Sequence, residues 1–386
     1  MKDKDYFNRP ICRDITVSMN HAIIIGDSTH NTLSAVRSLG EANIPQTLIL
    51  VGDQDTCFVR HSKYLKKRNL FCIRHLDQCL SILTELHQNH QNATLITTFD
   101  MAAEWVDAHE PCLSEWFCTP CRGKQLARLF NKAEQCKLAK ECGLTVPFSF
   151  IYERGMPFPN DKITYPFITK PLISSAGEKS DIHICKNEED LSQVFLQSSR
   201  CSHFLIQQFI DKEYEIDIIG VSTDLGVVLG GGVHKFRHWP PVIGAGAFGV
   251  FKKMAAFDIN IHGIEKFIEK SNYHGPFSVE FLHASDGNNY FMEVNFRNEG
   301  LAYVSTCAGV NLHALYLDSA CEINWSKFRQ TYMMNYSIDL LYVKEGKLSL
   351  WQWFKDFFKT RCFINLCFSD PGPFVAHYKR KVFRKK

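Results

Sequence analysis

The segment FMEVNFRNEG (291–300) contains side chains that could bind a metal ion and a phosphate. Glu293, Asn295 and Arg297 alternate there with apolar residues. Because successive side chains of a β-strand point to opposite faces, the three polar side chains share one face. Carboxylate and amide oxygens suit Mg²⁺, and a guanidinium can hold a phosphate. The segment therefore predicts a cation and phosphate site on one face of a sheet.

A predicted β-hairpin places a second carboxylate opposite the first. Its two strands flank Asp286–Gly287, a dipeptide typical of a two-residue hairpin turn. With the turn centred there, Glu280 pairs with Glu293, and Ser278 pairs with Asn295. Two carboxylates directly across an antiparallel pair repel each other, and a divalent cation removes that repulsion. Glu280, Glu293 and Asn295 are therefore the predicted ligands of Mg²⁺, or of Mn²⁺; the alternative is a solvated face with an accidental acidic pair.

Two lysines upstream of the hairpin could contact the phosphates of a nucleotide. Lys132 lies in a predicted helix, and Lys170 ends a predicted strand. The loop SSAGEKS follows Lys170 and contains Gly177. Its backbone N–H groups, together with the lysine ammonium, could cradle phosphate oxygens. Taken alone, each lysine is more often a solvated surface residue.

The junction between two predicted strands near residue 210 could hold the rest of a nucleotide. Gln208, Phe209 and Ile210 could present backbone groups to the edge of an adenine ring. After the junction, Glu213 or Glu215 could accept hydrogen bonds from ribose hydroxyls.

A further pair of basic residues lies in the strand predicted at 227–239. Lys235 and Arg237 alternate there, ahead of a loop rich in glycine and alanine. Strand alternation places both side chains on one face, where they would suit a carboxylate substrate or an acyl phosphate. A solvated strand face is an equally good interpretation.

The elements that must position these residues divide the chain into three expected parts. Strands at 21–28, 46–53 and 93–100, with a helix after the first, predict a Rossmann-like α/β domain over 1–118. Strand-rich sequence with interspersed helices predicts an α+β domain over 119–320. Residues 321–386 form an aromatic and basic extension.

Composition narrows the class of protein. The chain has 386 residues, of which 45% are hydrophobic and 22% charged, as in soluble globular proteins. A net charge of +3 gives no reason to expect a nucleic-acid partner. The first residues are polar, without the apolar core of a signal peptide, and the 15 scattered cysteines read as reduced thiols. We therefore expect a cytoplasmic protein.

The aromatic run WQWFKDFF (351–358) and the basic C-terminal tail suggest a weak contact with a membrane surface. Packing of these aromatic residues against the body of the protein is the preferred alternative.

The order of these motifs resembles that of ATP-grasp ligases. Lys132, Lys170 with its Gly/Ser loop, QQFIDKEYE, Glu280 and E-x-N-x-R follow one another as they do in that family. KEYEID is similar to a segment of carbamoyl-phosphate synthetase, and SLGEANIP and RHSKYLKK resemble the domain that precedes ATP-grasp modules. NEGLAYVSTCAGVNLHALYLD resembles the D-aspartate ligases. The resemblance covers about 15–320 and favours the D-aspartate ligase and carbamoyl-phosphate-synthetase-like branch.

The resemblance implies a Rossmann-like pre-ATP-grasp domain followed by an ATP-grasp fold, with ATP and Mg²⁺ as cofactors. It implies that Lys132 and Lys170 contact the phosphates, that Glu213 holds the ribose, and that Arg297 stabilises the transferred phosphoryl group. The junction near residue 210 corresponds to the segment of the family that contacts adenine, which we call the hinge. It departs from the family, because a glutamine, Gln207 or Gln208, stands where an acid is common.

The resemblance also implies an activity. We expect an ADP-forming carboxylate–amine ligase that acts through an acyl phosphate and joins a D-aspartate-like amino acid to an amine of a peptide or cell-envelope precursor. Its partners would be these small molecules, with a homodimer as one option. The alternatives are a non-catalytic ATP-binding regulator and a peripheral envelope-assembly protein that uses the basic tail.

Overall fold

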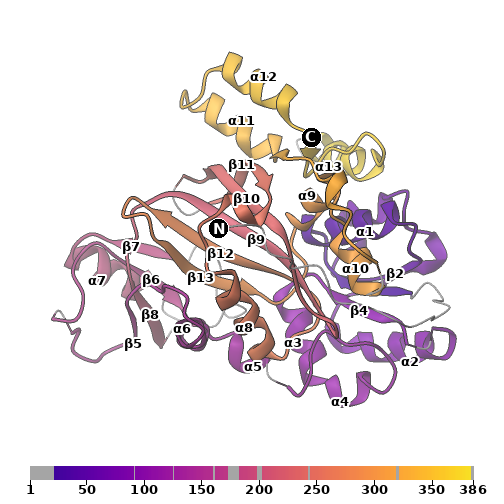
Figure 1. Ribbon diagram of the computed structural model, residues 1–386, viewed down its shortest axis with the longest axis horizontal. Coiled ribbons are helices and arrows are strands. Elements are labelled where there is room, and N and C mark those ends of the chain that lie inside the picture. The colour runs from indigo at the N-terminus through magenta and orange to yellow at the C-terminus, as the bar shows by residue number, and fades with distance from the viewer. Residues whose placement is uncertain are drawn as a thin grey trace.

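The computed structural model describes residues 21–90, 92–124, 126–159, 161–172, 182–197, 202–241, 244–318 and 321–383. Gly177, expected to contact phosphate, lies outside these ranges. In the described ranges, three sheets with surrounding helices make up the fold (Figure 1).

The N-terminal sheet is the predicted Rossmann-like one. Its four strands are all parallel, in the order β3-β2-β1-β4, and β1 is fully buried. The strands are β1 (Ala22–Gly26), β2 (Gln46–Val51), β3 (Leu70–Ile73) and β4 (Thr94–Thr97). The helices are α1 (His30–Glu41), α2 (Cys79–Asn89), α3 (Asp100–Ala108), α4 (Glu110–Leu113) and α5 (Leu126–Leu129). The strand order reverses between β1 and β4, and ligands of such sheets bind outside the carboxyl ends of the strands at that point.

The central sheet carries most of the polar residues singled out above. Its order is β13-β12-β9-β10-β11-β14-β15. The strands are β9 (Lys212–Thr223), β10 (Gly226–Trp239), β11 (Ala245–Lys252), β12 (Pro276–Ala284), β13 (Asn289–Asn295), β14 (Thr331–Met334) and β15 (Cys362–Phe363). The helices before and after β12–β13 are α6 (Lys132–Glu141), α8 (Ile261–Ser271), α9 (Ala302–Cys307) and α10 (Leu312–Leu317).

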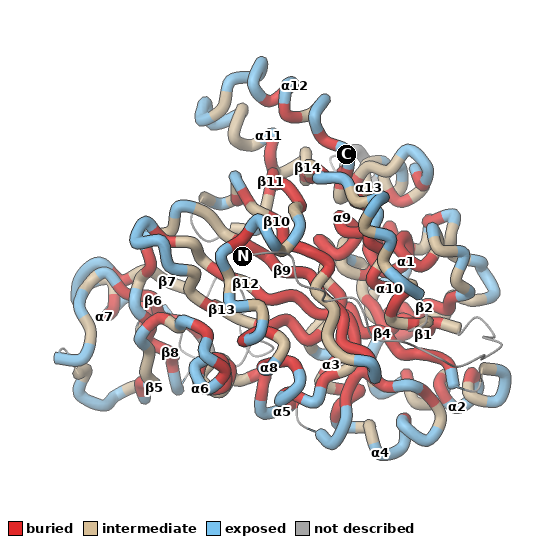
Figure 2. The backbone as a smooth tube through the Cα atoms, in the orientation of Figure 1, coloured by how far each residue is buried: buried red, intermediate tan, exposed pale blue. Residues whose placement is uncertain are grey.

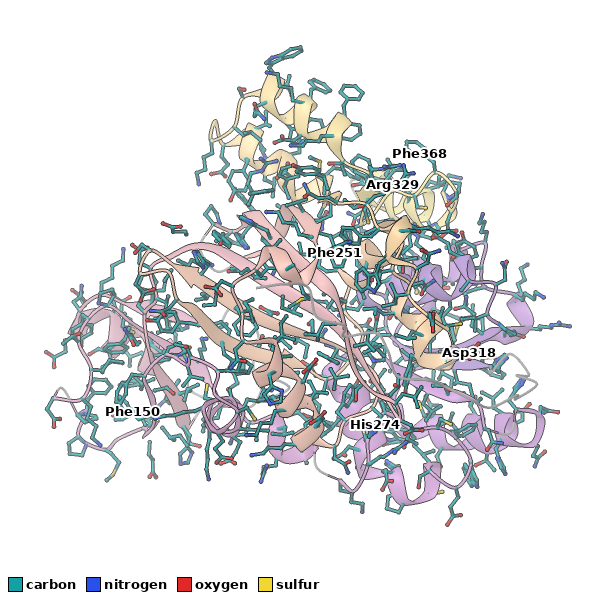
Figure 3. All side chains as sticks on the ribbon, viewed as in Figure 1. Phe150, Phe251, His274, Asp318, Arg329 and Phe368 are labelled. Atoms are coloured by element: carbon teal, nitrogen blue, oxygen red, sulfur yellow. The ribbon has the colours of Figure 1, made fainter. Side chains whose placement is uncertain are left out.

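A small third sheet has its own apolar core. Its order is β5-β8-β6-β7, and it lies at the far side of the central sheet from the Rossmann-like domain (Figure 1). Its elements are β5 (Ser149–Glu153), β6 (Phe167–Pro171), β7 (His183–Cys185), α7 (Glu188–Gln197) and β8 (His203–Gln208). Phe150 marks this sheet in Figure 3, whereas Phe251 lies in the middle of the molecule.

One continuous apolar cluster joins the Rossmann-like domain to the central sheet. Ile25 and Leu95 of the first sheet belong to it, as do Ile218, Phe277 and Phe296 of the second domain. Figure 2 shows the buried backbone running through both sheets. This shared core fixes the carboxyl ends of β1 and β4 relative to β13.

The C-terminal residues add to the central sheet and do not form a separate body. β14 pairs with β11, and β15 pairs with β14. Between β14 and β15 lie α11 (Tyr336–Lys344) and α12 (Leu350–Lys359), and α13 (Gly372–Phe383) follows β15. A buried ion pair between Arg37 Nε and Asp370 Oδ2, 3.1 Å apart, ties the residues before α13 to α1.

None of the helices in the described ranges has the length and apolar character needed to cross a bilayer. The cysteines that fall within those ranges are all free thiols.

Candidate active site

A row of carboxylates crosses three strands of the central sheet. β12 and β13 pair with Glu280 opposite Glu293 and Ser278 opposite Asn295, as predicted, but only beyond a register shift between Glu280 and Phe281. On its other side, Glu280 lies opposite Asp217 of β9. Residues directly opposite each other share a face, so the three acids stand side by side. The carboxylates of such a row repel one another unless nearby positive charges balance them.

Lys132 supplies the first positive charge at one end of this row. Its Nζ lies 2.8 Å from Glu293 Oε2. The helix that begins at Lys132 is held on β13 by Gln135, whose amide accepts from the N–H of Val294 at 2.7 Å and donates to its carbonyl at 3.1 Å. Burial lowers the pKa of Lys132, but the adjacent Glu293 outweighs it and raises the pKa above its ordinary value. The ammonium therefore stays charged.

Lys170 brings a second ammonium from the small sheet. Its Nζ donates to Gln207 Oε1 at 2.8 Å, and the side chain is buried. Burial, reinforced by the nearby positive charge of Lys132, lowers the pKa of Lys170 to about 8. The N–H of Lys132 donates to the carbonyl of Leu172 at 2.9 Å, which ties the start of α6 to the end of β6. Two ammonium groups thus converge on one space, as a polyphosphate requires.

Arg297 lies beyond the row and faces the Rossmann-like domain. Asn295 Nδ2 donates to Glu280 Oε1 at 3.0 Å and to Ser278 Oγ at 3.1 Å, and its Oδ1 accepts from Arg297 Nη2 at 3.1 Å. Arg297 Nε donates to Asp100 Oδ1 at 2.8 Å. Burial lowers the pKa of Arg297, but Asp100 and other nearby acids raise it further than burial lowers it. The guanidinium is thus held in place as a permanent positive charge.

The residues after Arg297 contact the carboxyl ends of β1 and β4. The N–H of Asn298 donates to the carbonyl of Thr97 at 2.9 Å, and its Nδ2 donates to the carbonyl of Asn31 at 2.6 Å. The N–H of Gly300 donates to Asn31 Oδ1 at 2.8 Å. The point between β1 and β4 at which the strand order of the Rossmann-like sheet reverses therefore lies beside the candidate site.

Lys235 neutralises a second group of acids on the same face. Its Nζ lies 2.7 Å from Asp217 Oδ2 and 3.4 Å from Glu215 Oε2. Carboxylate oxygens of Asp217, Glu280 and Glu299 lie within 4.8 Å of one another. Burial lowers the pKa of Lys235, but these acids, led by Asp217, raise it well above its ordinary value. Lys235 therefore joins the row as a buried cation.

The structure separates Arg237 from Lys235. Strand alternation predicts that both side chains face the same substrate, but the strand register shifts on either side of Arg237. Its guanidinium lies 2.7 Å from Asp339 of α11 and 2.8 Å from Asp356 of α12, over the ring of Phe248. Arg237 therefore holds the C-terminal helices to β10 and does not contact the carboxylate row.

The hinge residues lie at the junction of the small and central sheets. Gln208 ends β8, and its N–H donates to the carbonyl of Phe148 at 2.8 Å. Phe209 is half-buried, Ile210 is buried and Glu213 is exposed. These positions leave Glu213 accessible to a ribose.

Glu215, the alternative ribose ligand, is surrounded by basic side chains. Burial alone would raise the pKa of Glu215, but His238, Lys235 and Lys212 together lower it well below its ordinary range. Its Oε2 lies 2.9 Å from His238 Nε2, and its Oε1 pairs with Lys212. Glu215 is therefore an ionised acid already engaged within the protein.

Three residues near the predicted ones are not indicated by the sequence pattern. They are Asp217, Glu299 and Asp100. Asp217 stands two residues after Glu215, so strand alternation alone could have placed it on the same face as Glu215. The other two approach the site through tertiary contacts that no local pattern records.

The donor set fits a divalent cation. Glu280 and Glu293 present two carboxylates on adjacent strands, and hard oxygen ligands of this kind suit Mg²⁺. Asn295 turns its Nδ2 to Glu280 and its Oδ1 to Arg297, so its oxygen joins this set only with the amide turned over. The ammonium of Lys132 shows that positive charge is accommodated at Glu293.

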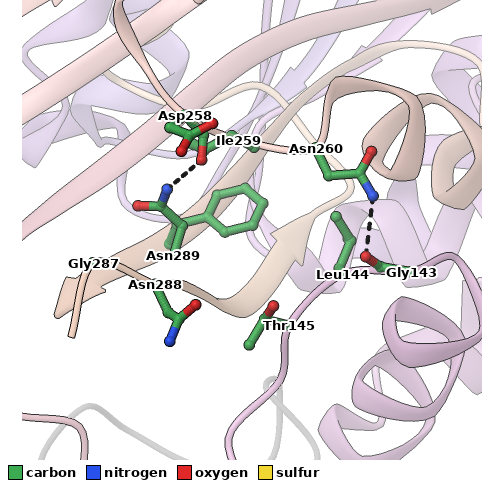
Figure 4. A pocket seen from close by; sticks show the side chains of 10 residues that line it. Gly143, Leu144, Thr145, Asp258, Ile259, Asn260, Gly287, Asn288 and Asn289 are labelled. Carbon is green, nitrogen blue, oxygen red and sulfur yellow. Dashed lines mark hydrogen bonds between the residues drawn. The ribbon is translucent and has the colours of Figure 1, made fainter.

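A pocket of about 340 Å³ lies on the other face of the hairpin (Figure 4). Phe281, which follows Glu280 and so points to the opposite face, is part of its lining. Asn289 Nδ2 donates across it to the carbonyl of Asp258 at 2.6 Å, and Asn260 Nδ2 donates to the carbonyl of Gly143 at 3.0 Å. This pocket is therefore distinct from the carboxylate row.

Comparison with known proteins identifies the fold. No protein-family model matches the chain, and no curated protein matches it. Three solved structures illustrate the similarity. Staphylococcus aureus N5-carboxyaminoimidazole synthetase complexed with ADP is 17% identical with a TM-score of 0.64, over 86% of this chain and 89% of that one. Bacillus licheniformis L-amino acid ligase is 14% identical with a TM-score of 0.60, over 79% and 75%.

The biotin carboxylase domain of Hydrogenobacter thermophilus 2-oxoglutarate carboxylase, in complex with MgADP, ADP and bicarbonate, is 14% identical with a TM-score of 0.60, over 82% and 74%. These similarities, with the three sheets described above, confirm the expected fold: a Rossmann-like domain followed by an ATP-grasp fold.

Proposed function

We propose that this protein is an ADP-forming carboxylate–amine ligase that acts through an acyl phosphate. One observation carries the proposal: Lys132, at the start of α6, and Lys170, in β6 of the small sheet, converge beside a carboxylate row that ends at Arg297. Polyphosphate binding needs converging cations, and metal-assisted phosphoryl transfer needs the acids.

ATP would lie between the small sheet and the central sheet. Lys132 and Lys170 would donate to its phosphate oxygens, the backbone of Gln208–Ile210 would contact adenine, and Glu213 would accept from the ribose. Mg²⁺, held by Glu280, Glu293 and Asn295, would balance the negative charge of the phosphates. The solved structures with ADP and MgADP in the same fold support this placement.

The carboxylate substrate would lie where Arg297 faces the carboxyl ends of β1 and β4. One of its oxygens attacks the γ-phosphorus of ATP, and ADP leaves. Arg297, held by Asp100 and Asn295, stabilises the negative charge of the phosphoryl group during transfer. An amine then attacks the acyl carbon, and phosphate leaves with the oxygen that came from the acid.

A D-aspartate-like amino acid is our preferred carboxylate, and an amine of a peptide or cell-envelope precursor is our preferred acceptor. The likeness of the segment after Arg297 to the D-aspartate ligases supports this choice. An L-amino acid ligase among the similar structures shows that the fold accommodates amino acids. We place the reaction in the cytoplasm, in keeping with the free thiols of the described residues.

The test begins with a screen of amino acids and amines for ATP-dependent phosphate release, read by mass spectrometry of the products. An accepted acid is then labelled with ¹⁸O in its carboxylate. The proposal expects ADP, and one labelled oxygen in phosphate for each amide formed. AMP with pyrophosphate would show adenylation instead, and unlabelled phosphate would show hydrolysis. Binding of ATP without turnover on any acid would favour a regulatory protein.

A further inference from the structure

Helix α12 is apolar on two sides. Its inner side carries Trp353, which is buried, and Phe357, whose ring lies 4.8 Å from that of Phe363 of β15. Its other side carries large apolar residues that are exposed to solvent: Leu350 (52%), Trp351 (70%), Phe354 (41%) and Phe358 (81%). Their spacing places them on one stripe, which we name the outer face of α12. A helix packed on one side leaves its other side polar unless that side meets something apolar.

The outer face is held rigidly away from the body. Asp356, on the inner side, accepts from Arg237 at 2.8 Å and from Gln352 at 3.1 Å. Ser349 caps the start of the helix by accepting from the N–H of Gln352 at 3.1 Å. Figures 1 and 2 show α12 at the edge of the molecule, beyond α11, with exposed residues along its outer side. The apolar side chains are therefore presented by a fixed helix.

The surroundings of the outer face are basic. The segment 344–361 contains five lysine or arginine residues and two acids. One of these acids, Asp356, is paired with Arg237, and the other, Glu345, lies 3.7 Å from Lys347. Lys355 and Lys359 are both exposed. The Nζ of Lys355 lies 5.5 Å from the centre of the Trp351 ring on the stripe, and the Nζ of Lys359 lies 3.9 Å from the centre of the Tyr332 ring of β14.

We propose that the outer face of α12 docks on an anionic lipid surface. Exposed tryptophan and phenylalanine beside lysines is the composition of helices that lie in the membrane interface, where aromatic rings enter the headgroup region and lysines meet phosphates. A second copy of the chain fits less well, because a two-fold contact through this face would bring its lysines near their own equivalents. At ten residues, α12 lies on a bilayer and does not span it. This inference does not depend on the proposed ligase activity.

The test is sedimentation of the full chain, without ATP, with two kinds of vesicle: phosphatidylcholine alone, and phosphatidylcholine in which about a third of the lipid is phosphatidylglycerol. We expect binding to the anionic vesicles that weakens as salt is added. The double variant Trp351→Ser/Phe358→Ser should bind about tenfold more weakly or worse. Lys355→Gln and Lys359→Gln should each cost about fivefold.

Leu196→Ser is the matched control. Leu196 is 79% exposed but lies on α7 of the small sheet, at a different edge of the molecule, so its replacement should not change vesicle binding (Figure 1). Equal binding by wild type and the double variant, or no binding to anionic vesicles, would overturn the proposal. A dimer seen by light scattering that the double variant abolishes would also overturn it, since a second copy would then cover the face.

Discussion

Replacing Lys170 by methionine should stabilise the protein, or leave its stability unchanged, while weakening ATP binding. Burial and Lys132 lower the pKa of Lys170 from 10.5 to about 8. That difference corresponds to roughly 3 kcal/mol by which folding disfavours the ammonium at neutral pH. Methionine removes this cost at similar volume, but it leaves Gln207 Oε1 without its donor, which costs about 1–3 kcal/mol. The net change at pH 7 is therefore between about zero and 2 kcal/mol of added stability.

Binding of ATP should change in the opposite direction. A hydrogen bond to a charged group contributes about 1.5–3 kcal/mol, so the loss of the ammonium should weaken ATP binding roughly ten- to a hundredfold. Adenosine, which lacks phosphates, should bind both proteins alike. Urea unfolding measures the first effect, and titration calorimetry with ATP and adenosine measures the second. Lys137→Met, at an exposed position of α6, is the matched control and should alter neither quantity noticeably.

The pH dependence of the free energy of unfolding independently tests whether folding lowers the pKa of Lys170. Since the folded-state pKa of Lys170 lies below its unfolded value, the unfolded chain binds more protons than the folded chain between pH 8 and pH 10.5. The free energy of unfolding of wild type should therefore rise with pH in that window, by roughly 3 kcal/mol relative to Lys170→Met, and this difference should be flat below it. A variant that loses about 2 kcal/mol of stability at pH 7 and still binds ATP like wild type would refute the reasoning.

Three further predictions concern the neighbouring residues. Glu293→Gln should lower turnover by about two orders of magnitude or more, because it removes a metal ligand; steady-state kinetics at saturating Mg²⁺ test this. Its stability should change by about 1 kcal/mol or less, because the ion pair with Lys132 is partly exposed; urea unfolding tests this. Asp100→Asn should lower kcat by roughly tenfold and leave the Kd of ATP unchanged, because it loosens only Arg297; an unchanged kcat would argue against this positioning role. Arg237→Met should destabilise the protein by about 3–5 kcal/mol, because it leaves two carboxylates of the C-terminal helices without their cation; a loss of under about 1 kcal/mol on thermal unfolding would contradict this.

The sequence alone determined those parts of the site that depend on local geometry. Counting outward from a two-residue turn at Asp286–Gly287 predicts the pairing of Glu280 with Glu293, and the structure contains this pair. Next to the turn the register differs by one residue from that count, with Phe281 opposite Phe291, and a shift between Glu280 and Phe281 restores the predicted pairing. The Rossmann-like sheet follows from short apolar strands that alternate with helices, and the similar solved structures confirm the fold class. The aromatic run at 351–358 was interpreted as either packed or exposed, and the structure shows both, because one helix carries apolar residues on two sides.

Only the tertiary structure decided which side chains meet across long stretches of chain. Asp217 joins Glu280 because β9 lies next to β12, and Asp100 meets Arg297 because a shared core brings the end of β4 to β13. Lys235 enters the acidic row and Arg237 does not, because register shifts interrupt the alternation that the sequence pattern assumes. Local patterns follow from backbone periods of two or 3.6 residues, whereas these contacts follow from the packing of whole elements, which minimises exposed apolar surface over the entire chain.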